Sequence, residues 1–341
     1  MAGAGPLVLG IESSCDETAA AVVRGGREVL SSVIHSQIAE HAAWGGVVPE
    51  IAGRSHLAKI VPSVEQALAD AGVGRDQLDA VAVTTRPGLL GSLLVGVTAA
   101  KALAWAWGKP LVDVHHIEAH IYAALMSLDE WRFPYVTLVV SGGHTSLYRT
   151  GSPMEHELLG STLDDAAGEA LDKGAAMLGL AYPGGPSIER AGAEGDPAAY
   201  AFKQPMLKGD SLDFSFSGMK TALLYKLKGA GGRREDQTLP ESRDLPGMAA
   251  SFEHALVETL ARKCLRACEL QGIDRLLVGG GVGRNRRLRA RLGERAAEAG
   301  VEVAFAKPEH CTDNAVMIAG LGGARFAAGC RAGLDLDVAA R

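Results

Sequence analysis

The segment LVLGIESSCDETAAAVV, residues 7–23, decides the fold that this sequence predicts. Its apolar start, residues 7–11, predicts a strand, residues 12–18 predict a polar turn, and residues 19–23 predict a return strand. The same order recurs from residue 135, where the apolar run YVTLVV precedes the small-residue tip SGGHT and a second apolar stretch. Two such hairpins in one chain indicate that a single folding unit occurs twice.

The elements that follow each hairpin also match. After the first we expect strands at 78–84 and 111–114 and helices at 89–107 and 116–125; after the second, strands at 275–278 and 302–306 and helices at 284–299 and 313–328. Alternating strands and helices indicate a layered α/β fold, and the repeated order predicts two similar domains with a cleft between them.

The expected domain ranges are 1–133 and 134–330, although part of the C-terminal helix could pack on the first domain. The second domain would carry a helical insertion at about 166–262, within which the charged segment 228–246 would be exposed or mobile. Residues 331–341 are expected to form a frayed tail.

Composition limits the class of protein. The 341 residues suffice for two domains, and 43 glycines without a collagen period predict tight loops that approach a ligand closely. With 34 basic and 40 acidic residues the net charge is −6, which excludes a strongly basic nucleic-acid-binding protein. The aromatic content of 5% argues against a stacking surface for bare single-stranded nucleic acid.

The sequence predicts a cytoplasmic protein that does not enter a membrane. Its longest charge-free apolar run, near residues 87–100, ends at Lys101 and falls short of the roughly 20 residues that cross a bilayer. The start MAGAGPLVLGIE lacks the basic region and cleavage site of a signal peptide. Five cysteines without a CxxC pair speak against a disulfide framework and fit a reducing compartment.

The segment HIEAH contains a candidate metal-binding pair. His116 and His120 are four residues apart on a predicted helix, so both imidazoles could hold one ion, although two surface histidines are the alternative. The metallopeptidase pattern HExxH requires its glutamate where Ile117 stands, and Glu118 would face elsewhere. Asp313 begins the corresponding helix of the second repeat, where it could be an N-cap or could lie across the cleft from the histidines. Two histidines and one carboxylate with open positions suit iron(II) or zinc.

Each hairpin tip is a candidate anion site, because small residues leave backbone N–H groups available to a ligand. Ser13, Asp16 and Thr18 line the first tip, and residues 141–145 form the second. One tip alone would be an ordinary turn, whereas two equivalent tips in a duplicated fold indicate phosphates bound between them. Asp16 would repel a phosphate unless a cation or a proton transfer is involved.

Polar residues beside glycine loops of the second half are candidate nucleoside contacts. The loop GGGVGRN, residues 279–285, fits neither the Rossmann nor the P-loop pattern, but a flat ring could lie on its glycines while Asn285 bonds a base or ribose. Asp172 precedes the turn YPGGP and Glu189 follows it, so both carboxylates could accept hydrogen bonds from sugar hydroxyls. The alternative for both acids is a solvated helix face with a cap.

The motifs occur in a fixed order over nearly the whole chain: GIESSCDET at 10–18, HIEAH at 116–120, SGGHT at 141–145, DDAAGEALDK at 164–173, YPGGP at 182–186, GGGVGRN at 279–285 and DN at 313–314. This set resembles the tRNA N6-adenosine threonylcarbamoyltransferase family, bacterial TsaD type, formerly called O-sialoglycoprotein endopeptidases. The resemblance implies an ASKHA (actin-like ATPase) fold, in which two domains flank a nucleotide cleft. It also implies transfer of a threonylcarbamoyl group from threonylcarbamoyl-AMP to the exocyclic amine of adenosine 37, with release of AMP, in tRNAs that read codons beginning with A.

The resemblance assigns roles to particular residues. His116, His120 and Asp313 become metal ligands, with iron(II) as the expected ion and zinc as the alternative. The first substrate contacts become Val139, Val140, Ser141, Gly142 and Gly143, and the adenosine-side contacts become Asp172, Gly185, Glu189 and Asn285. We hypothesise that Asp16 acts as a base for the attacking amine or orients it. The implied partners are tRNA, a TsaB-like inactive paralogue and a TsaE-like ATPase.

Three other functions stay open from the sequence. An ASKHA-type ATPase or kinase would use the same hairpins but would not need His116 and His120 as ligands. A metallopeptidase would need a glutamate next to the first histidine. A catalytically silent scaffold could lose both histidines, and this chain keeps them.

Overall fold

The computed structural model describes residues 5–202, 209–228 and 244–340. The chain divides into two compact units, the first formed by Met1–Trp131, Ser152–Glu155 and Lys307–Arg341, and the second by Arg132–Gly151 and His156–Ala306. Most of the segment 228–246, expected to be exposed or mobile, lies outside the described residues.

The first unit contains a five-stranded sheet in the order β3-β2-β1-β4-β5. Strands β1 (Leu7–Glu12), β2 (Glu17–Arg24) and β3 (Glu28–Ser36) form an antiparallel meander, and β4 (Ala80–Arg86) and β5 (Leu111–His115) continue it in parallel to β1. Side chains alternate along β1, so Leu7, Leu9 and Ile11 face one core cluster and Val8 faces another.

Helices supply the other half of each core cluster. The Leu9 cluster includes residues of α2 (Pro49–Ala71) and α3 (Leu90–Trp107), and the Val8 cluster includes residues of α4 (His116–Met126) and α11 (Ala315–Ala327). Shorter elements of this unit are α1 (Ile38–His41), η1 (Ala42–Trp44), η2 (Arg75–Gln77) and α10 (Pro308–Cys311). The sheet is therefore covered on both faces.

The second unit repeats this sheet. Its strand order is β10-β9-β6-β7-β8, where β6 (Tyr135–Val140) pairs antiparallel with β7 (Thr145–Ser152) and parallel with β9 (Arg275–Gly279). The edge strands are β8 (Glu155–Ser161) and β10 (Glu302–Phe305). The duplicated α/β fold is confirmed. Each repeat also has a third strand beside its hairpin, β3 or β8, that was not predicted from the sequence.

The helices of the second unit are α5 (Ala167–Met177), α6 (Gly184–Ala191), α7 (Ser217–Lys228), α8 (Leu245–Gln271), η3 (Gly281–Arg284) and α9 (Arg286–Glu298). Arginines of α9 bind buried glutamates of α8: Arg287 pairs with Glu253, and Arg291 and Arg295 with Glu258. These arginines join two helices and are therefore not a free basic surface.

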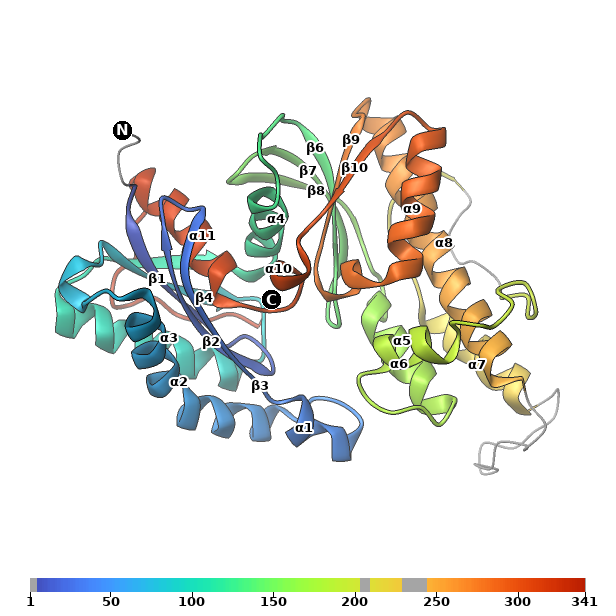
Figure 1. Ribbon diagram of the computed structural model, residues 1–341, viewed down its shortest axis with the longest axis horizontal. Coiled ribbons are helices and arrows are strands. Elements are labelled where there is room, and N and C mark those ends of the chain that lie inside the picture. Colours follow the sequence, from blue (N-terminus) through green and yellow to red (C-terminus); the bar gives the residue numbers. More distant parts are fainter. Residues whose placement is uncertain (1–4, 203–208, 229–243, 341) are drawn as a thin grey trace. The chain divides into compact units, whose positions relative to one another are not determined.

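The C-terminal helix α11 packs on the first sheet, which is the position that the expected ranges 1–133 and 134–330 left open for it (Figure 1). Small residues permit the close approach: a Cβ on Gly322 would lie 2.3 Å from Cβ of Ala82. The segment after α11 is also fixed, since the Ala332 N–H donates to Leu111 O (2.8 Å) and the Ala339 N–H to Thr85 O (3.0 Å). Residues 331–341 were expected to fray, but their described part is anchored to this unit.

One helix among the described residues, α3, is long and apolar enough to cross a membrane by length and composition. Its buried residues include Leu93, Val97 and Ala100, and it packs on α2 and β4. Packing in the first unit therefore accounts for the buried part of α3, whereas Leu94 and Trp105 on the same helix are exposed.

Candidate metal centre

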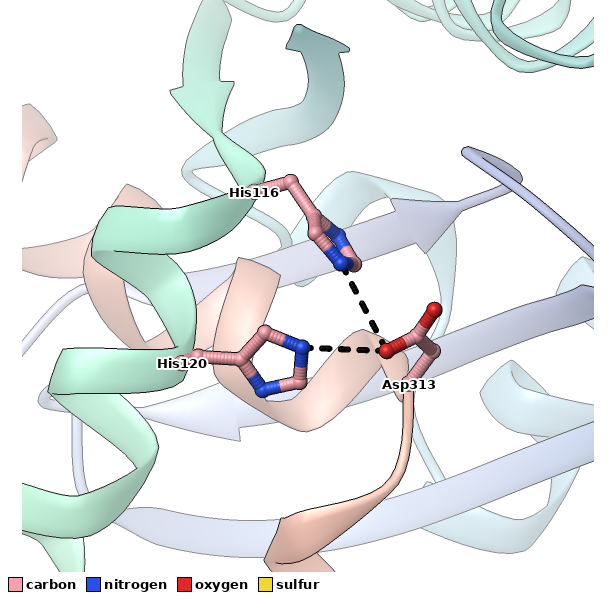
Figure 2. A group of neighbouring side chains, drawn as sticks. All are labelled: His116, His120 and Asp313. Carbon is pink, nitrogen blue, oxygen red and sulfur yellow. Dashed lines mark hydrogen bonds and ion pairs between the residues drawn. The ribbon is translucent and has the colours of Figure 1, made fainter. Parts of the chain in front are cut away.

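Three side chains of the first unit converge on one point. His116 begins α4 at the end of β5, His120 lies one turn later, and Asp313 comes from the loop before α11 (Figure 2). Oδ1 of Asp313 lies 3.0 Å from Nε2 of His120 and 3.5 Å from Nε2 of His116. Both imidazoles are buried, so they are not the surface pair that the spacing alone left open.

Asp313 is available because its neighbour caps the helix. The Asn314 side chain accepts the Met317 N–H at 3.0 Å and is the N-cap of α11. The alternative that Asp313 is only an N-cap is therefore excluded.

The donor set fits a single cation. One ligand atom from each residue lies within 4.8 Å of the others. Two ligands bound to one cation at about 2.1 Å are roughly 3.0 to 3.4 Å apart in octahedral or tetrahedral geometry. The distances of 3.0 and 3.5 Å from Asp313 to the two histidines match this spacing.

Glu12 is buried and lies beside Nδ1 of His116, the ring nitrogen other than the one that faces Asp313. This role was not predicted from the sequence. Oε2 of Glu12 lies 3.1 Å from Nδ1 of His116 and accepts the Thr84 hydroxyl at 2.6 Å, while Oε1 accepts the Ser14 N–H at 2.5 Å. A carboxylate can only accept, so Nδ1 carries the proton and Nε2 faces Asp313. Metal-ligating histidines are commonly oriented in this way. The sequence feature that could have indicated this role is the position of Glu12, an acid at the end of the otherwise apolar strand β1.

Charges in this cluster are balanced by a proton. Burial lowers the pKa of His116, but Asp313 and Glu12 outweigh it and hold that pKa well above its ordinary value. Burial raises the pKa of both carboxyls, yet His116 keeps the pKa of Glu12 below its ordinary value and that of Asp313 well below. A cation that binds here would replace this proton.

The first hairpin tip carries Asp16, the candidate base. Burial, Asp313 and Asp16 together raise the pKa of the adjacent Glu17 well above its ordinary value. Burial, Asp16 and Asp313 likewise raise the pKa of Cys15, so its thiol stays protonated at neutral pH.

Two predicted phosphate contacts of this tip, Ser13 and Thr18, have side chains that bond other residues of the first unit. Thr18 is fully buried with its hydroxyl 2.7 Å from Nδ1 of His56, and the Ser13 hydroxyl donates to Ser92 O at 2.9 Å. Both side chains support the tip from inside, and their role as phosphate contacts stays a prediction.

The second group of predicted residues lies in the second unit. Asp172 on α5 accepts the Gly184 N–H at 2.7 Å, and Gly185 and Glu189 follow one turn apart on α6. Nδ2 of Asn285 donates to Oε2 of Glu189 at 3.2 Å. The structure thus connects Asp172 to the turn before Glu189, and Glu189 to Asn285.

Asn285 has structural duties that its predicted role did not include. Its Oδ1 caps α9 by accepting the Leu288 N–H, and its Nδ2 also donates to Glu253 at 2.6 Å. It is buried, so it fixes the loop that follows β9.

Residues of the second tip differ in exposure. Val139 and Val140 have no exposed surface, and Ser141 is buried, whereas Gly142 and Gly143 are exposed. The glycines are therefore the accessible part of the tip, and contact between substrate and the backbone of Val139 and Val140 stays a prediction.

Glu118 does not join the metal cluster. Burial raises the pKa of Glu118, Arg325 and Arg86 oppose that rise, and Asp113 adds to it. This placement gives no support to a metallopeptidase base.

Comparison with known proteins decides the family. The model of a family described as tRNA N6-adenosine threonylcarbamoyltransferase (TsaD) matches residues 28–320. The chain belongs to this family. Enzymes of the same name from Anaeromyxobacter sp. (strain Fw109-5) and Geobacter sulfurreducens are 54% and 51% identical over 97% of this chain, and the match covers 97% and 95% of their lengths. TsaD-family members with this name are transferases that modify tRNA, so this chain is such an enzyme.

Two solved structures share the fold. HypF of T. kodakarensis is 16% identical, with a TM-score of 0.63 over 95% of this chain and 48% of its own. Component A of (R)-2-hydroxyglutaryl-CoA dehydratase from Acidaminococcus fermentans is 14% identical, with a TM-score of 0.56 over 94% of this chain and 99% of its own. The α/β fold of the ASKHA type that the sequence predicted is confirmed.

Proposed function

We propose that this protein transfers the threonylcarbamoyl group of threonylcarbamoyl-AMP to the exocyclic amine of adenosine 37, in tRNAs that read codons beginning with A. The observation that carries this proposal is the convergence of His116, His120 and Asp313 in a chain of the TsaD family. AMP is the second product.

His116, His120 and Asp313 would hold one divalent cation. A donor set of two imidazole nitrogens and one carboxylate with open positions suits iron(II) first and zinc as the alternative. When bound, the cation would polarise the donor carbonyl and stabilise negative charge on its oxygen.

The chemistry requires no protein nucleophile, because the donor is a mixed anhydride. The amine nitrogen attacks the carbonyl carbon, the bond from that carbon to the phosphate oxygen breaks, and AMP leaves with the electron pair. The amine must lose one proton, and Asp16 would accept it or orient the amine. Cys15 beside it is unsuited to attack, since burial and neighbouring carboxylates raise the pKa of its thiol.

In the second unit, Asp172, Gly185 and Glu189 would contact the adenosine part of the donor. The side chain of Glu189 is partly exposed and accepts a hydrogen bond from Asn285, which would be the fourth contact and also fixes the loop after β9. The exposed Gly142 and Gly143, next to Ser141, would offer backbone N–H groups to the donor.

Helper proteins would bring tRNA to this chain. A net charge of −6 opposes the phosphates of tRNA, so a TsaB-like inactive paralogue and a TsaE-like ATPase would assist binding and turnover. We place the reaction in the cytoplasm, which suits an odd number of cysteines. The two compact units would correspond to the two ASKHA domains.

The test is reconstitution. Metal-loaded protein, threonylcarbamoyl-AMP, both helpers and unmodified tRNA should yield the modified nucleoside, whereas His116→Ala should not. Glu118→Ala is the matched control on the same helix and should keep activity. Nucleoside formation by His116→Ala at the normal rate would refute the role of the cluster, and ATP hydrolysis without nucleoside formation would favour the ATPase alternative.

A further inference from the structure

In the tip that carries Asp16, three consecutive backbone carbonyl groups accept hydrogen bonds from other segments of the first unit. Ser14 O accepts the Leu89 N–H (2.8 Å), and Asp16 O accepts the Gln37 N–H (2.9 Å). Between them, Cys15 O lies 2.9 Å from Nε2 of His56. The first and third of these carbonyls bond backbone N–H groups, whereas the middle one bonds a side chain of α2.

His56 belongs to a buried row of polar side chains. The Val48 N–H donates to Nδ1 of His41, Nε2 of His41 lies 3.1 Å from Oε1 of Gln37, and Nε2 of Gln37 lies 3.5 Å from Nδ1 of His56. The Thr18 hydroxyl lies 2.7 Å from the same Nδ1 of His56. Both imidazoles and the amide are buried, so each of these groups needs a partner of the right kind.

The direction of each bond follows from its ends. The Cys15 carbonyl can only accept, so Nε2 of His56 carries its proton, and Nδ1 accepts from Thr18 and Gln37. Nδ1 of His41 accepts from Val48, so Nε2 of His41 donates to Gln37. Burial lowers the pKa of His56, although the Cys15 carbonyl opposes the shift, which is consistent with a neutral ring.

We propose that His56 is a positioning residue for the reaction, acting by fixing the Cys15–Asp16 peptide and with it the Asp16 carboxylate. The inference rests on the proposed role of Asp16. His56 is buried and bonded at both ring nitrogens, so it takes no proton from substrate. A displacement of about 1 Å in a catalytic group can cost roughly 100-fold in rate.

The experiment compares three variants in the reconstituted transfer reaction. His56→Leu should lower kcat by about 10- to 100-fold and leave zinc affinity unchanged, because His56 touches none of the three candidate metal ligands. His56→Gln should restore most of kcat, since a glutamine also offers one donor side and one acceptor side. Ser63→Ala, at a buried position of the same helix, should retain kcat.

A double mutant separates this inference from the role of Asp16. If His56 acts through Asp16, His56→Leu should add little to the loss in Asp16→Ala. Additive losses, or an unchanged kcat in His56→Leu, would overturn the inference while the role of Asp16 stands. Full activity of Asp16→Ala would overturn both. Should His56→Leu not fold, Gln37→Met supplies the test, and an unchanged kcat in that variant overturns the inference.

Discussion

Replacement of Glu12 by glutamine tests the support behind the candidate metal centre. The carboxylate is fully buried and accepts from three donors: the Ser14 N–H, the Thr84 hydroxyl and Nδ1 of His116. Glutamine has the same shape but only one accepting atom. If its oxygen keeps the Ser14 N–H, its amide group faces Nδ1 of His116 and forces that nitrogen to accept. The proton then moves to Nε2, the atom that faces Asp313 and would bind the cation.

The expected size of the effect is a loss of 10- to 100-fold in zinc affinity, as found when supporting partners of metal-bound histidines are removed. That range corresponds to about 1.4 to 2.8 kcal/mol of binding free energy. The measurement is calorimetric titration of the metal-free protein at a fixed pH near neutrality.

Asp113→Asn provides the control for a lost carboxylate in the same unit. Asp113 lies on β5 and pairs with Arg325 at 3.0 Å, so its replacement should leave zinc affinity unchanged. Circular dichroism should show that both variants fold. A Glu12→Gln protein that binds zinc as tightly as the parent would refute the orientation of His116 by Glu12.

Three further outcomes are expected in urea unfolding. Asn314→Ala should cost about 1 kcal/mol, because α11 loses its N-cap. Gly280→Ala should cost more than about 1 kcal/mol, since φ is +91° and the new Cβ would lie 2.3 Å from Val140 O. Burial raises the pKa of Asp164, but hydrogen bonds led by that from Ser215 lower it to about 2. The ionised Asp164 therefore stabilises the fold above its unfolded pKa near 3.9, and this stabilisation is lost as pH falls toward 2. Asp164→Asn should remove about 1 kcal/mol of this pH-dependent stability, a value reduced because the side chain is exposed to solvent. Equal stability of parent and variant at pH 6 would contradict each of the three expectations.

Local sequence was sufficient for the repeated strands and helices. The apolar run of β1 and the i, i+4 spacing of His116 and His120 are properties of neighbouring residues, so they could be predicted without contacts. The duplication then allowed Asp313 to be considered with the histidines, although 193 residues separate it from His120.

Supporting residues could not be predicted in the same way. Glu12 has the neighbours of an ordinary strand residue, and its role appears only where β1 meets β4 and α4. Asn285 was predicted as a ligand contact beside a glycine loop and Thr18 at a small-residue hairpin tip, but the bonds of each to groups far along the chain could not be predicted.

The sequence by itself determined the alternation of strands and helices, its duplication and the residue types able to bind a cation, because these depend on short-range periodicity. Only the tertiary structure decided which polar atoms face each other: Asn314 rather than Asp313 caps α11, and α11 packs on the first sheet. The physical reason is that a buried polar atom must find a partner in three dimensions, and that partner is set by the packing of distant elements.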